Sequence, residues 1–341
     1  MHYYKNFSIK LIVIPFINLL KMKYLKAIKL KAKNKNLVGR VIFMDSLKVA
    51  IIGLDTSHSI EFARRMNDPN CEPKMKVEGI KAVSCLRFET PFQNKEGLDS
   101  RQKQLESWGI MVTEDFDECV SDCDAIMLEI NDPAYHSEYF EKVVKLGKPI
   151  FLDKPLADSY KSGKAIYDLA KKYNAKVFSA SSLRFVTELS EAKNKIEHPE
   201  FVSVYGPLGL APAGSSIVWY GVHSMEMLQK LMGPGASSLR AVKDEKGAVC
   251  VVKYKNGNRG IVELNINSYI YGGMVRTKEK ANFFAVDMSM AYTLELREVA
   301  KFFMGGEAPV SLEDTLEVMD LLDTAQRSYD SGNEEALNRV Y

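Results

Sequence analysis

Short, uninterrupted apolar runs alternate with helix-like segments from Met44 to about residue 182, and this rhythm constrains the fold more than any other feature. Strands without polar alternation are buried on both faces, and their alternation with helices implies right-handed parallel crossovers. We therefore expect an α/β fold that opens with a doubly wound parallel sheet over residues 44–182. The expected strands are 47–53, 79–86, 110–112, 124–130, 149–155 and 176–180.

After residue 183 the pattern changes to that of an antiparallel sheet. The turn Asn256-Gly257-Asn258 separates two apolar runs and predicts a β-hairpin. We expect residues 183–341 to form a second α/β domain built on an open, mostly antiparallel sheet. The uncovered face of such a sheet predicts a homodimer or homotetramer. Further strands are expected near 200–206, 238–243, 273–278 and 281–287, and helices over 222–233, 294–306 and 312–328.

The first 43 residues differ in composition from the rest of the chain. They hold nine lysines and Arg40 without any acid, whereas the whole chain has a net charge of +2, so the remainder is mildly acidic. That balance argues against a nucleic-acid partner. The apolar stretch 11–20 is too short to span a bilayer, so no membrane association is expected. Three interpretations of this segment remain open: an upstream extension before a start at Met44, a basic amphipathic helix, or a targeting segment. We favour the upstream extension.

Cysteine usage indicates the compartment. The chain has five cysteines, an odd number, and no C-x-x-C pair. This is typical of reduced thiols, so a cytoplasmic location is expected.

The turn after the first expected strand is the first candidate binding site. A Rossmann dinucleotide-binding turn follows G-x-G-x-x-G, because glycines let the backbone approach the pyrophosphate. Here only Gly53 is present, and Asp55 stands at the second glycine position, where a carboxylate would repel a phosphate. Thr56, Ser57 and His58 can supply donors, or one of these polar residues caps the following helix. Arg87 is the nearest base after the second strand and leaves NAD and NADP both open.

Two further segments carry side chains suited to catalysis. Asp153 and Lys154 end the fifth expected strand, at the sheet edge where ligands of parallel sheets gather. Tyr220 and His223 share one stripe of a helix in the second half. Histidine titrates near neutrality and suits proton transfer to an alkoxide. His223 with Glu226 is a poor metal pair, and no metal is expected.

Taken together, these segments resemble the Gfo/Idh/MocA family, the glucose-fructose oxidoreductase and inositol dehydrogenase relatives, over nearly all of residues 46–330. The resemblance also rests on NDPAYH (131–136), KPIFLDKPLA and SSLRF (181–185). Its E-K-P motif corresponds to Asp153-Lys154-Pro155. Its D-x-G-x-H-x-x-D helix corresponds to Trp219, Gly221, His223 and Glu226, with tryptophan in place of the first acid.

The resemblance implies an NAD(P)-dependent oxidoreductase that transfers hydride between a nicotinamide cofactor and a sugar, cyclic polyol or related carbohydrate. Lys154, His223 and Tyr220 are then the expected catalytic residues. There are two alternatives to this function: an NAD-assisted glycosidase on the same fold, and a catalytically silent sensor or regulatory protein. The expected cofactor-binding residues are Gly53, Asp55, Thr56, Ser57, His58, Arg87, Asn131, His136, Asp153 and Lys154. The expected substrate-binding residues are Lys154, Arg184, Trp219, Tyr220 and His223.

Overall fold

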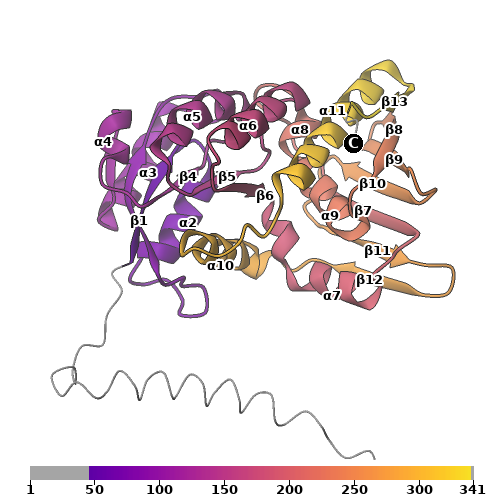
Figure 1. The fold of residues 1–341 in the computed structure, drawn as a ribbon, viewed down its shortest axis with the longest axis horizontal. Coiled ribbons are helices and arrows are strands. Elements are labelled where there is room, and N and C mark those ends of the chain that lie inside the picture. The colour runs from indigo at the N-terminus through magenta and orange to yellow at the C-terminus, as the bar shows by residue number, and fades with distance from the viewer. Residues whose placement is uncertain (1–45, 339–341) are drawn as a thin grey trace, which may run out of the picture. The chain divides into compact units, whose positions relative to one another are not determined.

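The computed structural model of this protein describes residues 46–338, which contain two β-sheets with helices packed on them (Figure 1). The expectations for residues 1–43 and for a start at Met44 lie outside the described residues. Within residues 46–338, no helix is both long enough and apolar enough to cross a membrane.

The first sheet is parallel and has the order β3-β2-β1-β4-β5-β6, which confirms the doubly wound prediction. Strands β4, β5 and β6 are fully buried, as their apolar runs predict. The carboxyl ends of β1, β4 and β5 therefore lie next to one another at one edge. The strands are β1 (Leu47–Ile52), β2 (Ile80–Leu86), β3 (Met111–Thr113), β4 (Ala125–Leu128), β5 (Ile150–Asp153) and β6 (Val177–Ala180).

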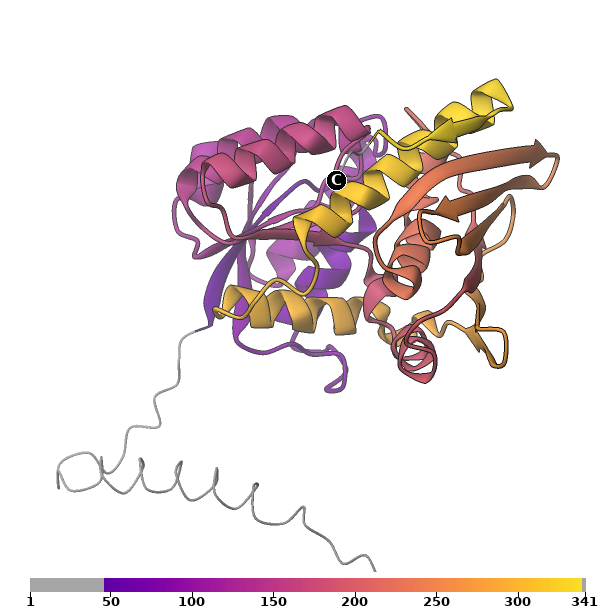
Figure 2. The ribbon, with the colours of Figure 1, turned by 45° about the vertical axis from the view of Figure 1, so that its right-hand side comes forward.

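Helices cover both faces of the first sheet (Figures 1 and 2). Side chains of α4, α5 and α6 pack with the sheet residues that point to one face, and those of α2 and α3 pack on the other. Each helix except α5 begins at a polar N-cap that accepts a backbone hydrogen bond. The helices are α2 (Ser57–Asn67), α3 (Lys95–Ser107), α4 (Phe116–Val120), α5 (His136–Val143) and α6 (Tyr160–Lys172).

The second sheet is mixed, with the order β12-β11-β7-β10-β9-β8-β13. The expected hairpin is confirmed as β9 and β10, and the other pairs are antiparallel except β7 with β10, which run parallel. The strands are β7 (Phe201–Pro207), β8 (Ala236–Asp244), β9 (Gly247–Tyr254), β10 (Arg259–Asn265), β11 (Gly272–Arg276), β12 (Ala281–Ala285) and β13 (Glu334–Ala336).

The helices of the second half do not all stay with the second sheet. Helices α9 and α11 pack on one face of that sheet, and α11 also contacts α6. Helix α10, expected with the second half, instead packs on the first sheet, where Phe302 meets Phe178 of β6 edge to face at 5.1 Å. The chain therefore returns to the first sheet after residue 290. These helices are α7 (Thr187–Lys195), α8 (Ser216–Trp219), α9 (Val222–Met232), α10 (Ala291–Phe303) and α11 (Leu312–Ser331).

Candidate active site

One cavity of about 310 Å³ opens where the carboxyl edge of the first sheet meets helix α9. Its size is at the lower end of the range for small-molecule sites. The first half of the chain contributes Thr56, Ser57, His58, Asn131, Lys154 and Ser182 to its lining. The second half contributes Trp219, Tyr220, His223, Tyr269, Tyr271, Met288 and Tyr292.

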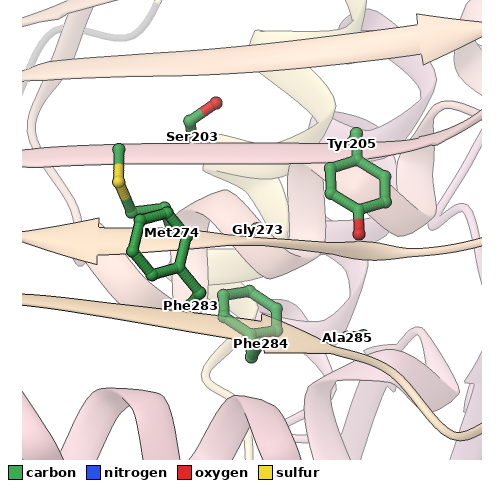
Figure 3. Close-up of a pocket in the computed structure, with 7 residues that line it drawn as sticks. All are labelled: Ser203, Tyr205, Gly273, Met274, Phe283, Phe284 and Ala285. Carbon is green, nitrogen blue, oxygen red and sulfur yellow. The ribbon is translucent and has the colours of Figure 1, made fainter.

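A larger hollow of about 540 Å³ lies elsewhere, on the open face of the second sheet (Figure 3). Tyr205, Met274 and Phe283 line it, and no carboxylate, imidazole or amine is among the residues that do so. The smaller cavity is therefore the candidate active site, since acid–base chemistry requires titratable groups.

The turn between β1 and α2 is built around Gly53 and Thr56. Gly53 has φ of +107°, and a Cβ atom there would lie 2.5 Å from the carbonyl oxygen of Glu129, so only glycine fits. Thr56 caps α2 by accepting a hydrogen bond from the backbone nitrogen of His58 at 3.2 Å. The N-terminus of α2, with its free amides and positive dipole end, therefore faces the cavity.

Asp55 does not line this cavity, so the structure lends no support to the expected repulsion of a phosphate, which stays a prediction. Its buried carboxylate accepts hydrogen bonds from the backbone nitrogen of Asn131 at 2.8 Å and from the Thr90 hydroxyl at 2.7 Å. Burial raises the pKa of Asp55, and these hydrogen bonds oppose that shift. The side chain ties the turn after β1 to the turn after β4.

Lys154 and His223 line the same cavity although they are far apart in sequence. Lys154 follows the last residue of β5, and His223 lies in the first turn of α9. His223 Nδ1 lies 2.7 Å from the hydroxyl oxygen of Ser181, which leaves Nε2 available to a ligand. Burial, and then the nearby Lys154 and His58, hold the pKa of His223 well below its usual value, so the imidazole is neutral at pH 7.

Aromatic residues close the cavity from the second half. Trp219 donates its indole N–H to the Asn131 side-chain oxygen at 2.9 Å, and so links α8 to the loop after β4. The ring of Tyr220 contacts the His223 ring edge to face, with 5.4 Å between the ring centroids. Tyr271, which directly precedes β11 of the second sheet, contacts the same ring at a centroid distance of 5.8 Å. These contacts fix the imidazole while leaving its surroundings largely apolar.

Three predicted site residues are occupied by other contacts. His136 is fully buried, and its ring nitrogens lie 2.7 Å and 3.3 Å from the carbonyl oxygens of Ile130 and Leu156. Arg184 forms a buried ion pair with Glu226 at 2.6 Å. Neither residue lines this cavity, and both hold neighbouring segments in place; a ligand contact by either one stays a prediction.

Arg87 is the third. Its guanidinium pairs with Asp99 at 2.7 Å and lies 3.7 Å from Glu114. Its charge is therefore already compensated by carboxylates of the chain itself.

Several residues at the site were not predicted from the sequence. Tyr271, Tyr269, Met288 and Tyr292 come from loops and helix starts that only the tertiary fold brings to the cavity. Ser181, the partner of His223, lies in the SSLRF segment but was not singled out. Two buried acids behind the cavity, Glu129 and Glu295, were also missed, and burial raises the pKa of both well above the usual range.

The residues present fit a bound dinucleotide at the turn and the helix. Gly53 permits the close packing of turn and strand, the α2 N-terminus faces the cavity, and no carboxylate of residues 46–338 lines the cavity. His58 stands at the third glycine position, but its ring packs beside Tyr292 at 4.9 Å and pairs with Asp153 at 2.8 Å. Thr56, Ser57, Asn131 and Lys154 are thus the residues that would hold the cofactor next to His223.

Comparisons with known proteins agree with this arrangement. Residues 47–181 match the family described as "Oxidoreductase family, NAD-binding Rossmann fold". The uncharacterized protein YMR315W of Saccharomyces cerevisiae is 26% identical over 228 residues, which cover 58% of this chain and 64% of the yeast protein. The chain thus matches less than two thirds of that relative's length.

Solved structures share the fold across both halves. A probable dehydrogenase from Thermotoga maritima has a TM-score of 0.71 at 18% identity and covers 86% of this chain and all of its own. The scyllo-inositol dehydrogenase from Lactobacillus casei, solved with NAD(H) and scyllo-inositol, has a TM-score of 0.70 at 15% identity and covers 85% of this chain and 99% of its own. Residues 47–181 of the chain thus match the Gfo/Idh/MocA oxidoreductase family in its NAD-binding Rossmann fold, and the solved structures extend the likeness in fold to the second half.

Proposed function

We propose that this protein is an NAD(P)-dependent dehydrogenase that acts on a CH–OH group of a sugar, cyclic polyol or related carbohydrate. The observation that carries the proposal is the convergence of Lys154 and His223 on one cavity at the N-terminus of α2. The family and the inositol dehydrogenase likeness support the same reaction class.

Each residue has a distinct role in this proposal. NAD(P), when bound, supplies the hydride acceptor or donor. Lys154 holds the reacting oxygen with a positive donor. His223 takes the hydroxyl proton at Nε2 during oxidation, and Tyr220 supports the ring.

Ser181 allows His223 to accept a proton in oxidation and to release one in reduction. A hydroxyl can accept a hydrogen bond from Nδ1 or donate one to it, so the proton on the ring can change sides without a change of partner. Nε2 can therefore receive a proton in oxidation or release one in reduction. The low pKa of His223 keeps the ring neutral and ready to accept a proton.

NAD is the preferred cofactor in this proposal. A 2′-phosphate needs a free cation near the end of β2, and Arg87 there is already paired with Asp99. We expect tighter binding of NADH than of NADPH. Asp99→Asn should improve NADPH binding by about fivefold, since a partly exposed ion pair contributes about 1 kcal/mol.

The proposal is tested with the full chain by NADH binding and by turnover of scyllo-inositol, myo-inositol and a panel of sugars. His223→Ala should lower kcat by roughly 10²- to 10⁴-fold with NADH affinity kept, whereas Lys154→Ala should also raise KM. The two losses should be less than additive. His198→Ala, which changes an exposed histidine, is the matched control.

Other outcomes identify the alternatives. Glycoside cleavage by protein that retains nicotinamide through purification would indicate the NAD-assisted glycosidase. Ligand binding without turnover of any substrate would indicate the sensor. Full activity of His223→Ala would show that another group carries the proton.

For the assembly, we propose a homodimer or homotetramer formed through the open face of the second sheet. Helices α9 and α11 cover the opposite face. The open face presents the hollow of about 540 Å³ and the exposed ring of Phe283, and a second copy would bury both.

A further inference from the structure

A cluster of buried polar atoms lies behind the cavity, at the carboxyl ends of β4 and β5. Both carboxylate oxygens of Glu129 and Glu295 are buried without a hydrogen-bond partner, and Asp153 beside them faces Nδ1 of His58 at 2.8 Å. Buried polar groups in folded proteins are nearly always satisfied, because an unmet group costs about 1–3 kcal/mol. The four unmet carboxylate oxygens of Glu129 and Glu295 therefore point to a partner that is not a group of the chain itself.

The geometry of these atoms suits a single ion. One ligand atom from each of His58, Glu129 and Asp153 lies within 4.8 Å of the others. His58 Nδ1 and an Asp153 oxygen are 2.8 Å apart, which is close enough for two neighbouring ligands of one cation. Glu295 approaches from α10, and its charge interacts with that of Asp153.

The charges around the cluster point to a divalent ion. When Glu129, Asp153 and Glu295 are all ionised they carry three negative charges, and Lys154 is the one lysine that interacts with all of them among the described residues. His223 is neutral, and the nearby carboxylate of Glu226 is already paired with Arg184. Burial raises the pKa of Glu129 and Glu295 well above the usual range, so these two acids ionise only where a cation compensates them, and two negative charges are what one divalent cation supplies.

We infer that His58, Glu129 and Asp153 form a binding site for one divalent cation, with Glu295 as a fourth ligand from α10. One imidazole with carboxylate oxygens is a donor set suited to Zn²⁺ or Mn²⁺. This site departs from our expectation of no metal, which concerned His223 and Glu226. The site could not be predicted from the sequence, because its ligands come from α2, the residue after β4, β5 and α10.

The position of the site means that a bound ion would link several elements of the fold. Its ligands connect the start of α2, the ends of two central strands and the helix that returns from the second half. A bound ion would hold α10 on the first sheet, and it would lie directly behind Lys154. Removing the ion should therefore lower the melting temperature of the whole protein.

The experiment uses the full chain, stripped with a chelator and titrated calorimetrically with Zn²⁺ and, separately, Mn²⁺. One equivalent should bind and raise the melting temperature. Glu129→Gln keeps the side chain's shape but removes its charge, and should weaken binding at least tenfold. Glu141→Gln, at an exposed acid on α5, is the matched control and should bind as the wild type does.

A second measurement keeps the inference testable if Glu129→Gln does not fold. Co²⁺ loaded into the wild type should give d–d absorption bands typical of nitrogen and oxygen ligands, and Zn²⁺ should displace it stoichiometrically. Two results would overturn the site. One is binding that Glu129→Gln leaves unchanged, and the other is wild type that binds no ion and shows the infrared band of protonated buried carboxylic acids. In the second case protons, and not a cation, neutralise the cluster. Neither result depends on turnover of a substrate.

Discussion

His223 shows how a single residue can be tuned by its surroundings. Its pKa lies well below 6.5 because the ring is buried and faces the positive charges of Lys154 and His58, while the carboxylate of Asp153 only partly opposes them. A histidine with a lowered pKa protonates only in more acidic solution. The residue therefore stays a competent proton acceptor through neutral and mildly acidic pH.

We expect this to appear in the pH profile. The acid limb of kcat/KM for oxidation should fall below pH 6.5, the ordinary histidine value. His223→Ala should abolish that limb as well as lowering the rate, while His198→Ala should change neither. If the acid limb persists in His223→Ala, a group other than His223 causes it.

Asp55 provides a second prediction at the residue scale. Its carboxylate accepts from the backbone nitrogens of Asn131 and Asp132, and an asparagine cannot present two acceptor oxygens. Asp55→Asn should cost about 1–3 kcal/mol of the free energy of unfolding, measured by urea denaturation. Asp168→Asn, at an exposed acid of α6, should change it by less than about 0.5 kcal/mol. Tighter NADH binding by Asp55→Asn at unchanged stability would support the phosphate-repulsion hypothesis.

At the element scale, the sequence predicts what depends on local pattern. The six strands of the first sheet are short, mostly apolar runs, and each was expected within a few residues. Helix α3 was not expected, because only Leu98 and Leu105 of its thirteen residues are buried and its apolar period is weak. The parallel pairing of β7 with β10 also escaped prediction, since strand order is set by contacts distant in sequence.

Helix α9 is held by a buried charge pair that can be tested. Burial raises the pKa of Glu226, and the Arg184 guanidinium at 2.6 Å opposes that shift. Arg184→Met leaves the carboxylate buried without its cation and should destabilise the protein by roughly 3–5 kcal/mol. The double variant Arg184→Met with Glu226→Gln should recover a large part of the loss in urea denaturation. If the double variant is as unstable as the single one, packing and not charge is the cause.

At the scale of the whole molecule, the site exists only because distant segments converge. Lys154 and His223 were predicted separately and only the resemblance joined them, while Ser181, Tyr271 and Glu295 reach the site through contacts that no local pattern encodes. The same holds for α10, whose return to the first sheet brings Tyr292 to the cavity. The candidate catalytic residues at strand and helix ends were thus predictable from the sequence. The aromatic residues that line the cavity around them were not.

The open face of the second sheet leads to a prediction about assembly. Phe283 of β12 is 75% exposed beside Met274 and Tyr205, so water contacts aromatic and thioether side chains there (Figure 3). A stable dimer needs about 800 Å² buried per partner, and a flat sheet face can supply such an area. Aromatic residues at the centre of an interface commonly contribute 2 kcal/mol or more, roughly thirtyfold in affinity.

We expect the wild type to sediment as a dimer or tetramer at micromolar concentration in analytical ultracentrifugation. Phe283→Glu places a charge in the centre of the proposed contact and should shift the protein to the monomer with its melting curve still cooperative. Leu210→Glu, at an exposed apolar residue outside this hollow, should leave the assembly unchanged. A wild type that is monomeric at all concentrations would mean that this face serves another partner, and an oligomer that survives Phe283→Glu would mean that the copies meet through a different surface.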